Sequence, residues 1–158
     1  MTIDEFSRAV LAIKPTLYRI CQTQLSSPAD REDAVQEAIC RAWQKRGALR
    51  DPGAFDGWLI RILVNECHNI QRQKSHIVLS DSPPELPTAE NGQSKALLDA
   101  MDALDEKKRL CVLLHHIEGY SVKEVARMLG IGESAVKQRL LRGRRKLKEM
   151  LSEEVFGQ

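Results

Sequence analysis

Basic side chains gather near the end of the chain at a spacing suited to binding DNA. Between Val136 and Lys148 the sequence contains no acidic residue, and its basic residues are Lys137, Arg139, Arg142, Arg144, Arg145, Lys146 and Lys148. Such side chains neutralise phosphates, and a guanidinium can pair with the edge of a base in the major groove. A basic run alone is more often a solvated helix face, so the residues around it decide between the two interpretations.

The surrounding residues predict a helix-turn-helix. Ser121 and Glu124 have the spacing of a capping box, in which a hydroxyl and a carboxylate accept hydrogen bonds from the amides that begin a helix. Gly130 supplies the backbone freedom that a sharp turn requires. The apolar faces before and after this turn are formed by Val125, Ala126, Leu129, Ile131, Val136 and Leu140. The basic run therefore lies on the second helix, which enters the major groove in motifs of this kind.

Three amphipathic helices are predicted before residue 75, because apolar residues recur there at steps of three and four. The first helix extends from Ile3 to Leu25 with a start or bend at Pro15, and the second begins at Asp30 as its cap. The third extends over about 54–74. Trp58 is interpreted as a core residue of this third helix. Its other inward-facing residues are predicted to be Phe55, Leu59, Ile62, Leu63 and Ile70.

The composition indicates two small helical domains. A hydrophobic content of 42% with only 4% aromatic residues suits compact helical packing. Residues 76–94 are rich in proline, glycine, serine and acidic residues, so we expect a flexible acidic linker there. The net charge of +2 is the balance of this acidic middle and the basic C-terminal part. The predicted fold is therefore all-α, with domains at 1–75 and 95–158.

The cysteines give no indication of a metal site. Cys21, Cys40, Cys67 and Cys111 each lie within an apolar helical pattern, so we expect buried free thiols in a reducing cytoplasm. No C-x-x-C or H-x-x-x-H spacing occurs, and no metal or other cofactor is expected. No stretch approaches the ~20 apolar residues of a membrane span, and the N-terminus lacks the pattern of a signal peptide. These features predict a cytoplasmic protein.

Two further motifs lie in the predicted first domain. Residues 33–43, D-A-V-Q-E-A-I-C-R-A-W, are similar to the pattern D-x-V-Q-E-x-[FV]-x-[RK]-x-W, and residues 55–65, F-D-G-W-L-I-R-I-L-V-N, are similar to F-x-x-W-L-x-x-I-x-x-N. Together with the helix-turn-helix, in this order, they make nearly the whole chain resemble the extracytoplasmic-function sigma factors. These are the smallest members of the sigma-70-type transcription initiation family.

The resemblance implies a role for each cluster of polar residues. Asp33, Gln36 and Glu37 lie at steps of three and four on one helix face, where they can meet basic groups of a partner. By resemblance, this face and Arg41 bind the clamp coiled coil of the largest subunit of core RNA polymerase. The first domain would also bind the −10 promoter element, with candidate contacts Arg46, Arg50, Arg61, Asn65, Asn69 and Arg72.

The helix-turn-helix would bind the −35 promoter element. Its candidate base-reading residues are Glu133, Ser134, Lys137, Gln138 and Arg139, and its candidate phosphate contacts are Arg142, Arg144 and Arg145. The resemblance further implies control by an anti-sigma factor. No membrane insertion of this chain is expected, because the sequence has no apolar stretch long enough to span a membrane. The resemblance implies no catalytic residue, because strand opening would be driven by captured bases and phosphates.

Three other functions stay open on the sequence alone. A response-regulator-type DNA-binding protein has a very similar helix-turn-helix, but it would require a receiver of alternating strands and helices upstream. A sigma-mimicking adaptor that binds only an anti-sigma protein would have no use for a phosphate-binding face. An enzyme would require an activated nucleophile, a carboxylate pair or a metal site, and the sequence indicates none of them.

Overall fold

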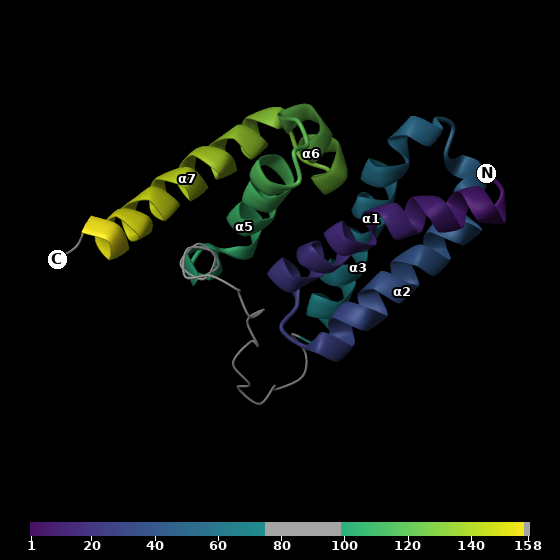
Figure 1. Cartoon of the computed structure of the whole chain (residues 1–158), viewed down its shortest axis with the longest axis horizontal. Coiled ribbons are helices and arrows are strands. Elements are labelled where there is room, and N and C mark those ends of the chain that lie inside the picture. The colour runs from purple at the N-terminus through teal and green to yellow at the C-terminus, as the bar shows by residue number, and fades with distance from the viewer. Residues whose placement is uncertain (75–98, 157–158) are drawn as a thin grey trace. The chain divides into compact units, whose positions relative to one another are not determined.

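The structure, a computed structural model, describes residues 1–74 and 99–156, with side chains to residue 151. All regular elements in these two ranges are helical, which confirms the predicted all-α class. The strands that a response-regulator receiver requires do not occur in residues 1–74. The chain divides into two compact units, an N-terminal one with α1, α2 and α3 and a C-terminal one with α5, most of α6, and α7 (Figure 1). The predicted linker, residues 76–94, lies outside the described residues.

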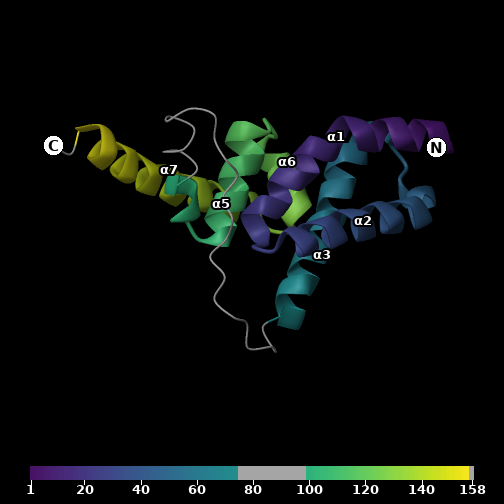
Figure 2. The ribbon, with the colours of Figure 1, turned by 60° about the horizontal axis from the view of Figure 1, so that its bottom comes forward.

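The N-terminal unit consists of three helices that contact one another in every pairing. Helices α1 (Ile3–Gln24) and α2 (Pro28–Gln44) run in opposite directions, and α3 (Phe55–Lys74) crosses both (Figures 1 and 2). Two short 3-10 turns, η1 (Arg46–Ala48) and η2 (Pro52–Ala54), connect α2 to α3.

Local sequence determines where these helices begin. Thr2 and Glu5 form a capping box at the start of α1, and Pro15 lies inside this single helix. The predicted start of α2 at Asp30 is wrong, because Ser27 is the N-cap and its hydroxyl accepts a hydrogen bond from the Asp30 amide. Pro28 at the first helical position has no amide hydrogen to leave unpaired, so it favours this earlier start.

The core of the N-terminal unit differs from the prediction at α3. Ile60 and Val64 are buried, whereas Ile62 and Ile70 are only half-buried. Helix α3 packs against both α1 and α2. Its buried face therefore differs from the apolar stripe expected for a helix that packs against one neighbour. Trp58 is half-buried at the edge of an aromatic cluster, with its ring centroid 6.1 Å from that of Phe55. The prediction of a core residue is therefore only partly right, because Trp58 packs against Phe55 but is not fully buried.

Three of the four cysteines are buried, as predicted. Cys21 and Cys67 bring their Sγ atoms to 3.9 Å between α1 and α3, and Cys111 is buried in the C-terminal unit. The prediction for Cys40 is wrong, because this thiol is exposed. It lies on the same side of α2 as Gln36 and Glu37, opposite the buried Ala34 and Ala38.

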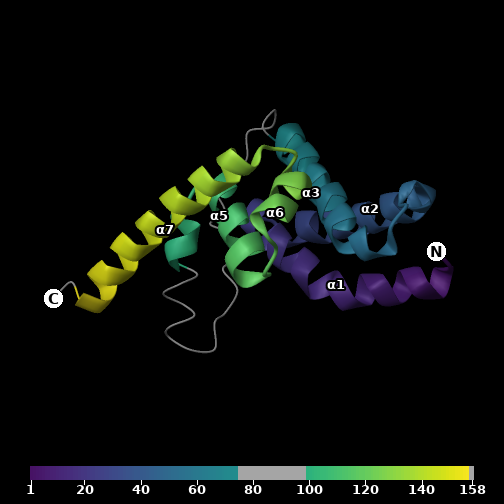
Figure 3. The same cartoon turned by 90° about the horizontal axis from the view of Figure 1, so that it is seen from above.

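The C-terminal unit presents the helix-turn-helix. Helix α5 (Glu106–Val112) continues into the π-helical turn η3 (Leu113–Ile117), followed by α6 (Val122–Leu129) and α7 (Glu133–Phe156), as Figure 3 shows from above. The predicted capping box is present, because the Ser121 and Glu124 side chains accept hydrogen bonds from each other's amides at 3.1 Å. Gly130 has a φ of 68°, which is the left-handed conformation that the turn requires.

Helix α7 packs closely against α5 through a position without a side chain. Gly143 is buried, and a Cβ atom at this position would lie 3.0 Å from Val112 Cγ2. It shares one face of α7 with Val136, Leu140 and Leu147, which are also buried. The opposite face of α7 is thereby held outward.

Candidate functional site

The predicted polymerase-binding residues share the outer face of α2. Asp33, Gln36 and Glu37 are exposed, whereas Ala34 and Ala38 behind them are fully buried. Burial of the opposite side therefore fixes which way this acidic face points.

A groove lies beside the acidic face, between α2 and α3. It has a volume of ≈ 880 Å³, and its polar lining comes from residues 30–41 of α2 and 66–74 of α3. All four predicted polymerase-binding residues line it, namely Asp33, Gln36, Glu37 and Arg41. The structure thus brings the whole predicted set together on one surface.

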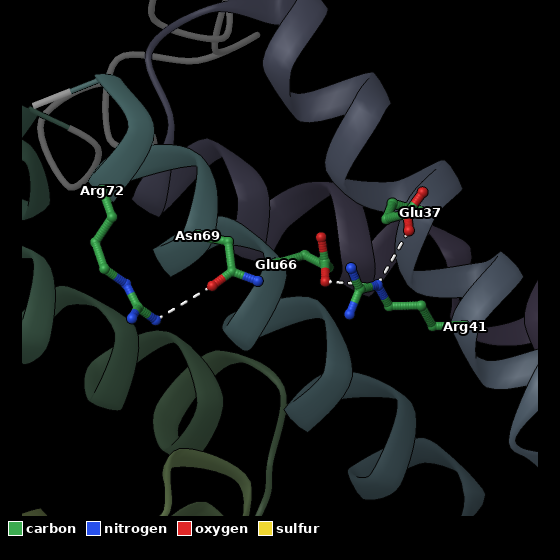
Figure 4. A network of polar contacts seen from close by, with 5 residues as sticks. All are labelled: Glu37, Arg41, Glu66, Asn69 and Arg72. Atoms are coloured by element: carbon green, nitrogen blue, oxygen red, sulfur yellow. Dashed lines mark hydrogen bonds and ion pairs between the residues drawn. The ribbon is translucent and has the colours of Figure 1, made fainter. Parts of the chain in front are cut away.

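Arg41 connects the two walls of this groove (Figure 4). Its Nε lies 3.0 Å from Glu37 Oε1 on the same helix and 2.9 Å from Glu66 Oε1 on α3. The Glu66 side chain is only 8% exposed, compared with 52% for Glu37 and 43% for Arg41. A buried carboxylate requires a cation or hydrogen-bond donors, and Arg41 provides the cation.

Glu66 was missed as a candidate from the sequence, although its position offered a signal. It follows Leu63 by three residues and precedes Cys67, and both neighbours are fully buried. A glutamate on an inward-facing stripe is unusual unless it is paired, so its position indicates a basic partner. The sequence does not identify the partner itself, because Arg41 lies on a different helix and the pairing depends on how α2 packs against α3.

The six predicted −10 contacts do not form a single cluster. Asn69 and Arg72 lie on the groove, where Arg72 Nη2 donates to Asn69 Oδ1 at 3.2 Å (Figure 4). Arg46 is half-buried, with its guanidinium 3.7 Å from the centroid of the Trp43 ring and Nη1 donating to the Trp43 carbonyl at 2.7 Å. The other three, Arg50, Arg61 and Asn65, are exposed and do not line the groove.

Most of the predicted −35 contacts are on the outer face of α7. Glu133, Ser134, Lys137 and Gln138 are exposed near its start, and Arg142, Arg144 and Arg145 are exposed further along. Among the side chains that the structure describes, no ion pair links these arginines or Lys137 to an acidic residue. Their positive charge is therefore available to a phosphate backbone.

Arg139 differs from the rest of this set, because it is half-buried at the edge of the packed face. Burial raises the pKa of the Cys111 thiol, and the positive charge of the nearby Arg139 guanidinium partly opposes that rise. Arg139 also contributes to lowering the pKa of Asp105, which is lowered mainly by the hydrogen bond from the Lys108 amide. It follows Val136 by three residues and so lies beside the buried stripe rather than opposite it.

In residues 1–74 and 99–151, no group of three or more His, Cys, Asp or Glu side chains is arranged to hold a metal ion. None of the described helices combines the length and apolar character that crossing a bilayer requires.

Family models match both parts of the chain. The model described as Sigma-70 region 2 matches residues 9–77, and the model described as Sigma-70, region 4 matches residues 94–147. The first match contains the groove and the acidic face, and the second contains the helix-turn-helix. Both predicted regions of resemblance are therefore recovered in the predicted order.

Individual relatives agree with these matches. The ECF RNA polymerase sigma factor SigM of Mycobacterium tuberculosis is 34% identical over 139 residues, covering 85% of this chain and 71% of SigM. The RNA polymerase sigma-E factor of Streptomyces coelicolor is 29% identical over 152 residues, covering 93% of this chain and 86% of the relative.

Two solved structures are similar in fold. The sigma factor RpoE of Bartonella quintana, solved in complex with the anti-sigma factor NepR, has a TM-score of 0.80 at 25% identity, covering 95% of this chain and 98% of RpoE. CnrH in complex with the cytosolic domain of CnrY has a TM-score of 0.68 at 25% identity, covering 93% and 87% of the two chains.

Proposed function

The chain belongs to the sigma-70 family as an extracytoplasmic-function (ECF) sigma factor, and from this membership we propose which of its surfaces bind core RNA polymerase and which bind promoter DNA. Members of the family are non-enzymatic transcription initiation factors that bind core RNA polymerase and direct promoter recognition. The observation that carries the assignment of surfaces is the separation of charge between the two units, acidic on α2 and basic on α7.

Core RNA polymerase is proposed to bind the acidic face of α2. Asp33, Gln36 and Glu37 are exposed together, and complementary charge across an interface selects the partner and increases the rate of association. Arg41 belongs to the same surface through its place on the groove. The family resemblance of this helix supports the clamp coiled coil of the largest subunit as the partner.

Promoter DNA is proposed to contact both units. The exposed Arg50, Arg61 and Asn65 are available to the −10 element without rearrangement of the described helices. Arg46, Asn69 and Arg72 would have to exchange an internal contact for DNA, and extrusion of a base adds a cost of a few kcal/mol. The outer face of α7 is proposed to bind the −35 element, with residues near its start at the bases and later arginines at phosphates.

Regulation and location follow from the same membership. RpoE and CnrH were solved with an anti-sigma factor and with the cytosolic domain of CnrY, respectively, which supports the proposal that an anti-sigma factor also controls this chain. We place its activity in the cytoplasm, where RNA polymerase works, and assign it no catalytic residue. The units are proposed to act as separate domains, 1–75 and 95–158, joined by residues 76–94.

Reconstituted transcription tests the proposed function. Purified core RNA polymerase, with and without the full chain, is supplied with a library of promoter sequences, and the initiated transcripts are sequenced. We expect initiation only when the chain is present, from templates that share a −10 and a −35 element. A chain that forms no complex with core polymerase at low salt would favour an ordinary DNA-binding protein. One that binds an anti-sigma factor but never supports initiation would favour the sigma-mimicking adaptor.

A further inference from the structure

One guanidinium serves two carboxylates at the acidic face. Arg41 Nε donates its hydrogen bond to Glu37 Oε1 at 3.0 Å and forms an ion pair with Glu66 Oε1 at 2.9 Å, so Glu37 shares its cation with a residue from another helix (Figure 4). Two carboxylates and one guanidinium leave one negative charge. The Glu66 side chain is 8% exposed and cannot present that charge to a partner, whereas Glu37 is 52% exposed and can.

Packing alone does not explain a glutamate at this position. Replacing a buried ion pair by apolar side chains of similar volume is often neutral or stabilising, so an apolar residue would serve the core of α3 at least as well. Its neighbours Leu63 and Cys67 are fully buried and show that the surroundings accept apolar groups. What Glu66 adds is a fixed negative charge on the inner side of Arg41.

We propose that Glu66 is a positioning residue for docking on core RNA polymerase: it holds Arg41 toward α3 and so leaves the charge of Glu37 available to the polymerase. This inference rests on the proposed function, in which the acidic face of α2 is the docking surface. Without the Glu66 charge, Glu37 is the one carboxylate left to Arg41 among the described side chains, and the two charges neutralise each other as a pair at i and i+4.

Neighbouring charges on the groove do not replace this arrangement. Lys74 is paired with Asp30 near the ends of α3 and α2, and Arg72 donates to Asn69. The ion pairs of Glu37 and Glu66 among the described side chains are both made with Arg41. Arg41 is thus the cation through which Glu66 acts.

A cycle of variants tests the proposal in the full chain. Binding to core polymerase is measured by competition for the wild type, Glu66→Gln, Glu37→Gln and the double variant. We expect each single substitution to weaken binding about fivefold, the loss typical of one exposed charge pair. The double variant should be no weaker than Glu37→Gln alone, because Glu66 acts only through the charge of Glu37.

Controls separate positioning from stability. Ile60→Val removes one methyl group from a fully buried residue of α3 outside the groove, so it destabilises the same unit and should leave the affinity for core polymerase unchanged. Glu66→Leu is measured beside Glu66→Gln, since both free Arg41 and both should weaken binding. Thermal unfolding shows that each variant is folded at the temperature of the assay.

The possible outcomes lead to different conclusions. If Glu66→Gln binds as tightly as the wild type, or if its effect multiplies with that of Glu37→Gln, Glu66 has no role through Glu37 and the inference is wrong. If the wild type itself does not bind core polymerase, the proposed function is wrong instead. A fivefold loss that disappears in the Glu37→Gln background supports the inference.

Discussion

Most charged side chains of the groove in the N-terminal unit are paired, unlike the basic side chains on the outer face of α7. Arg41 bonds to two carboxylates, and Lys74 is paired with Asp30. By contrast, the exposed arginines of α7 form no ion pair with another described side chain. Pairing holds charges in a fixed geometry, which suits a folded protein partner, whereas free cations suit a phosphate backbone of uniform charge. The difference indicates two surfaces built for two kinds of partner.

The largest expected effect concerns the unpaired surface. Combining Lys137→Ala, Arg142→Ala and Arg145→Ala should weaken binding of the holoenzyme to a duplex with a −35 element by about 100-fold at moderate salt. The slope of log affinity against log salt should fall by about three, because up to three phosphate contacts are lost. Titrations at four salt concentrations measure both quantities. A loss of affinity with an unchanged slope would contradict phosphate binding by this face.

The second-largest effect concerns the packing of α7 against α5, which keeps the basic face of α7 exposed. Gly143→Leu should reduce the free energy of unfolding by about 3 kcal/mol, because even a Cβ at this position lies 3.0 Å from Val112 Cγ2. Urea denaturation followed by circular dichroism measures the change. Gly47→Leu is the control, since nothing lies within 4 Å of a Cβ there. Equal stability of the two variants would show that α7 is not held against α5 in this way.

A smaller effect distinguishes a paired arginine from an unpaired one. Arg41→Ala should cost about 2 kcal/mol of unfolding free energy, because the buried Glu66 loses its cation, and exposure of Arg41 reduces the full penalty. Arg142→Ala removes an exposed arginine from α7 and should change stability by less than about 0.5 kcal/mol. Denaturant titrations compare the two variants. Similar losses would remove the contrast between the two surfaces.

The smallest effect appears at alkaline pH. The Tyr18 hydroxyl donates to Glu32 Oε2 at 2.6 Å, and this hydrogen bond raises the pKa of Tyr18 from 10.0 to about 12. Because the pKa of Tyr18 is higher in the folded state than in the unfolded state, the hydrogen bond stabilises the protein fully at a pH below 10. This stabilisation is lost as the pH rises from 10 to 12. Thermal unfolding across this range should show the loss in the wild type and a smaller loss in Tyr18→Phe. An identical pH dependence in both would contradict the assignment.

The sequence predicted those features that depend on residues close together in the chain. The capping box of Ser121 and Glu124 needs only a spacing of three, and the turn at Gly130 needs only a glycine between two apolar stripes. The acidic face of α2 follows in the same way from helical periodicity.

Features that depend on a third packing partner were missed. Burial of Ile60 and pairing of Glu66 depend on how α3 crosses α1 and α2, whereas the exposure of Cys40 follows from its place on the outer side of α2. Arg139 was grouped with the outer residues because a basic run gives no information on which of its members meets α5. A pattern of one helix defines its apolar side but does not define the edges of that side.

Independence of the two surfaces is the central claim, and paired binding measurements test it most directly. Affinity for core polymerase and affinity of the assembled holoenzyme for −35 DNA are measured for two variants. One is Asp33→Asn with Glu37→Gln, and the other is the triple alanine variant of α7. We predict that the α2 variant loses affinity for core polymerase but, once saturated with core, keeps its affinity for −35 DNA. The α7 variant should keep its affinity for core polymerase and lose its affinity for −35 DNA. Loss of both activities in either variant would contradict the account.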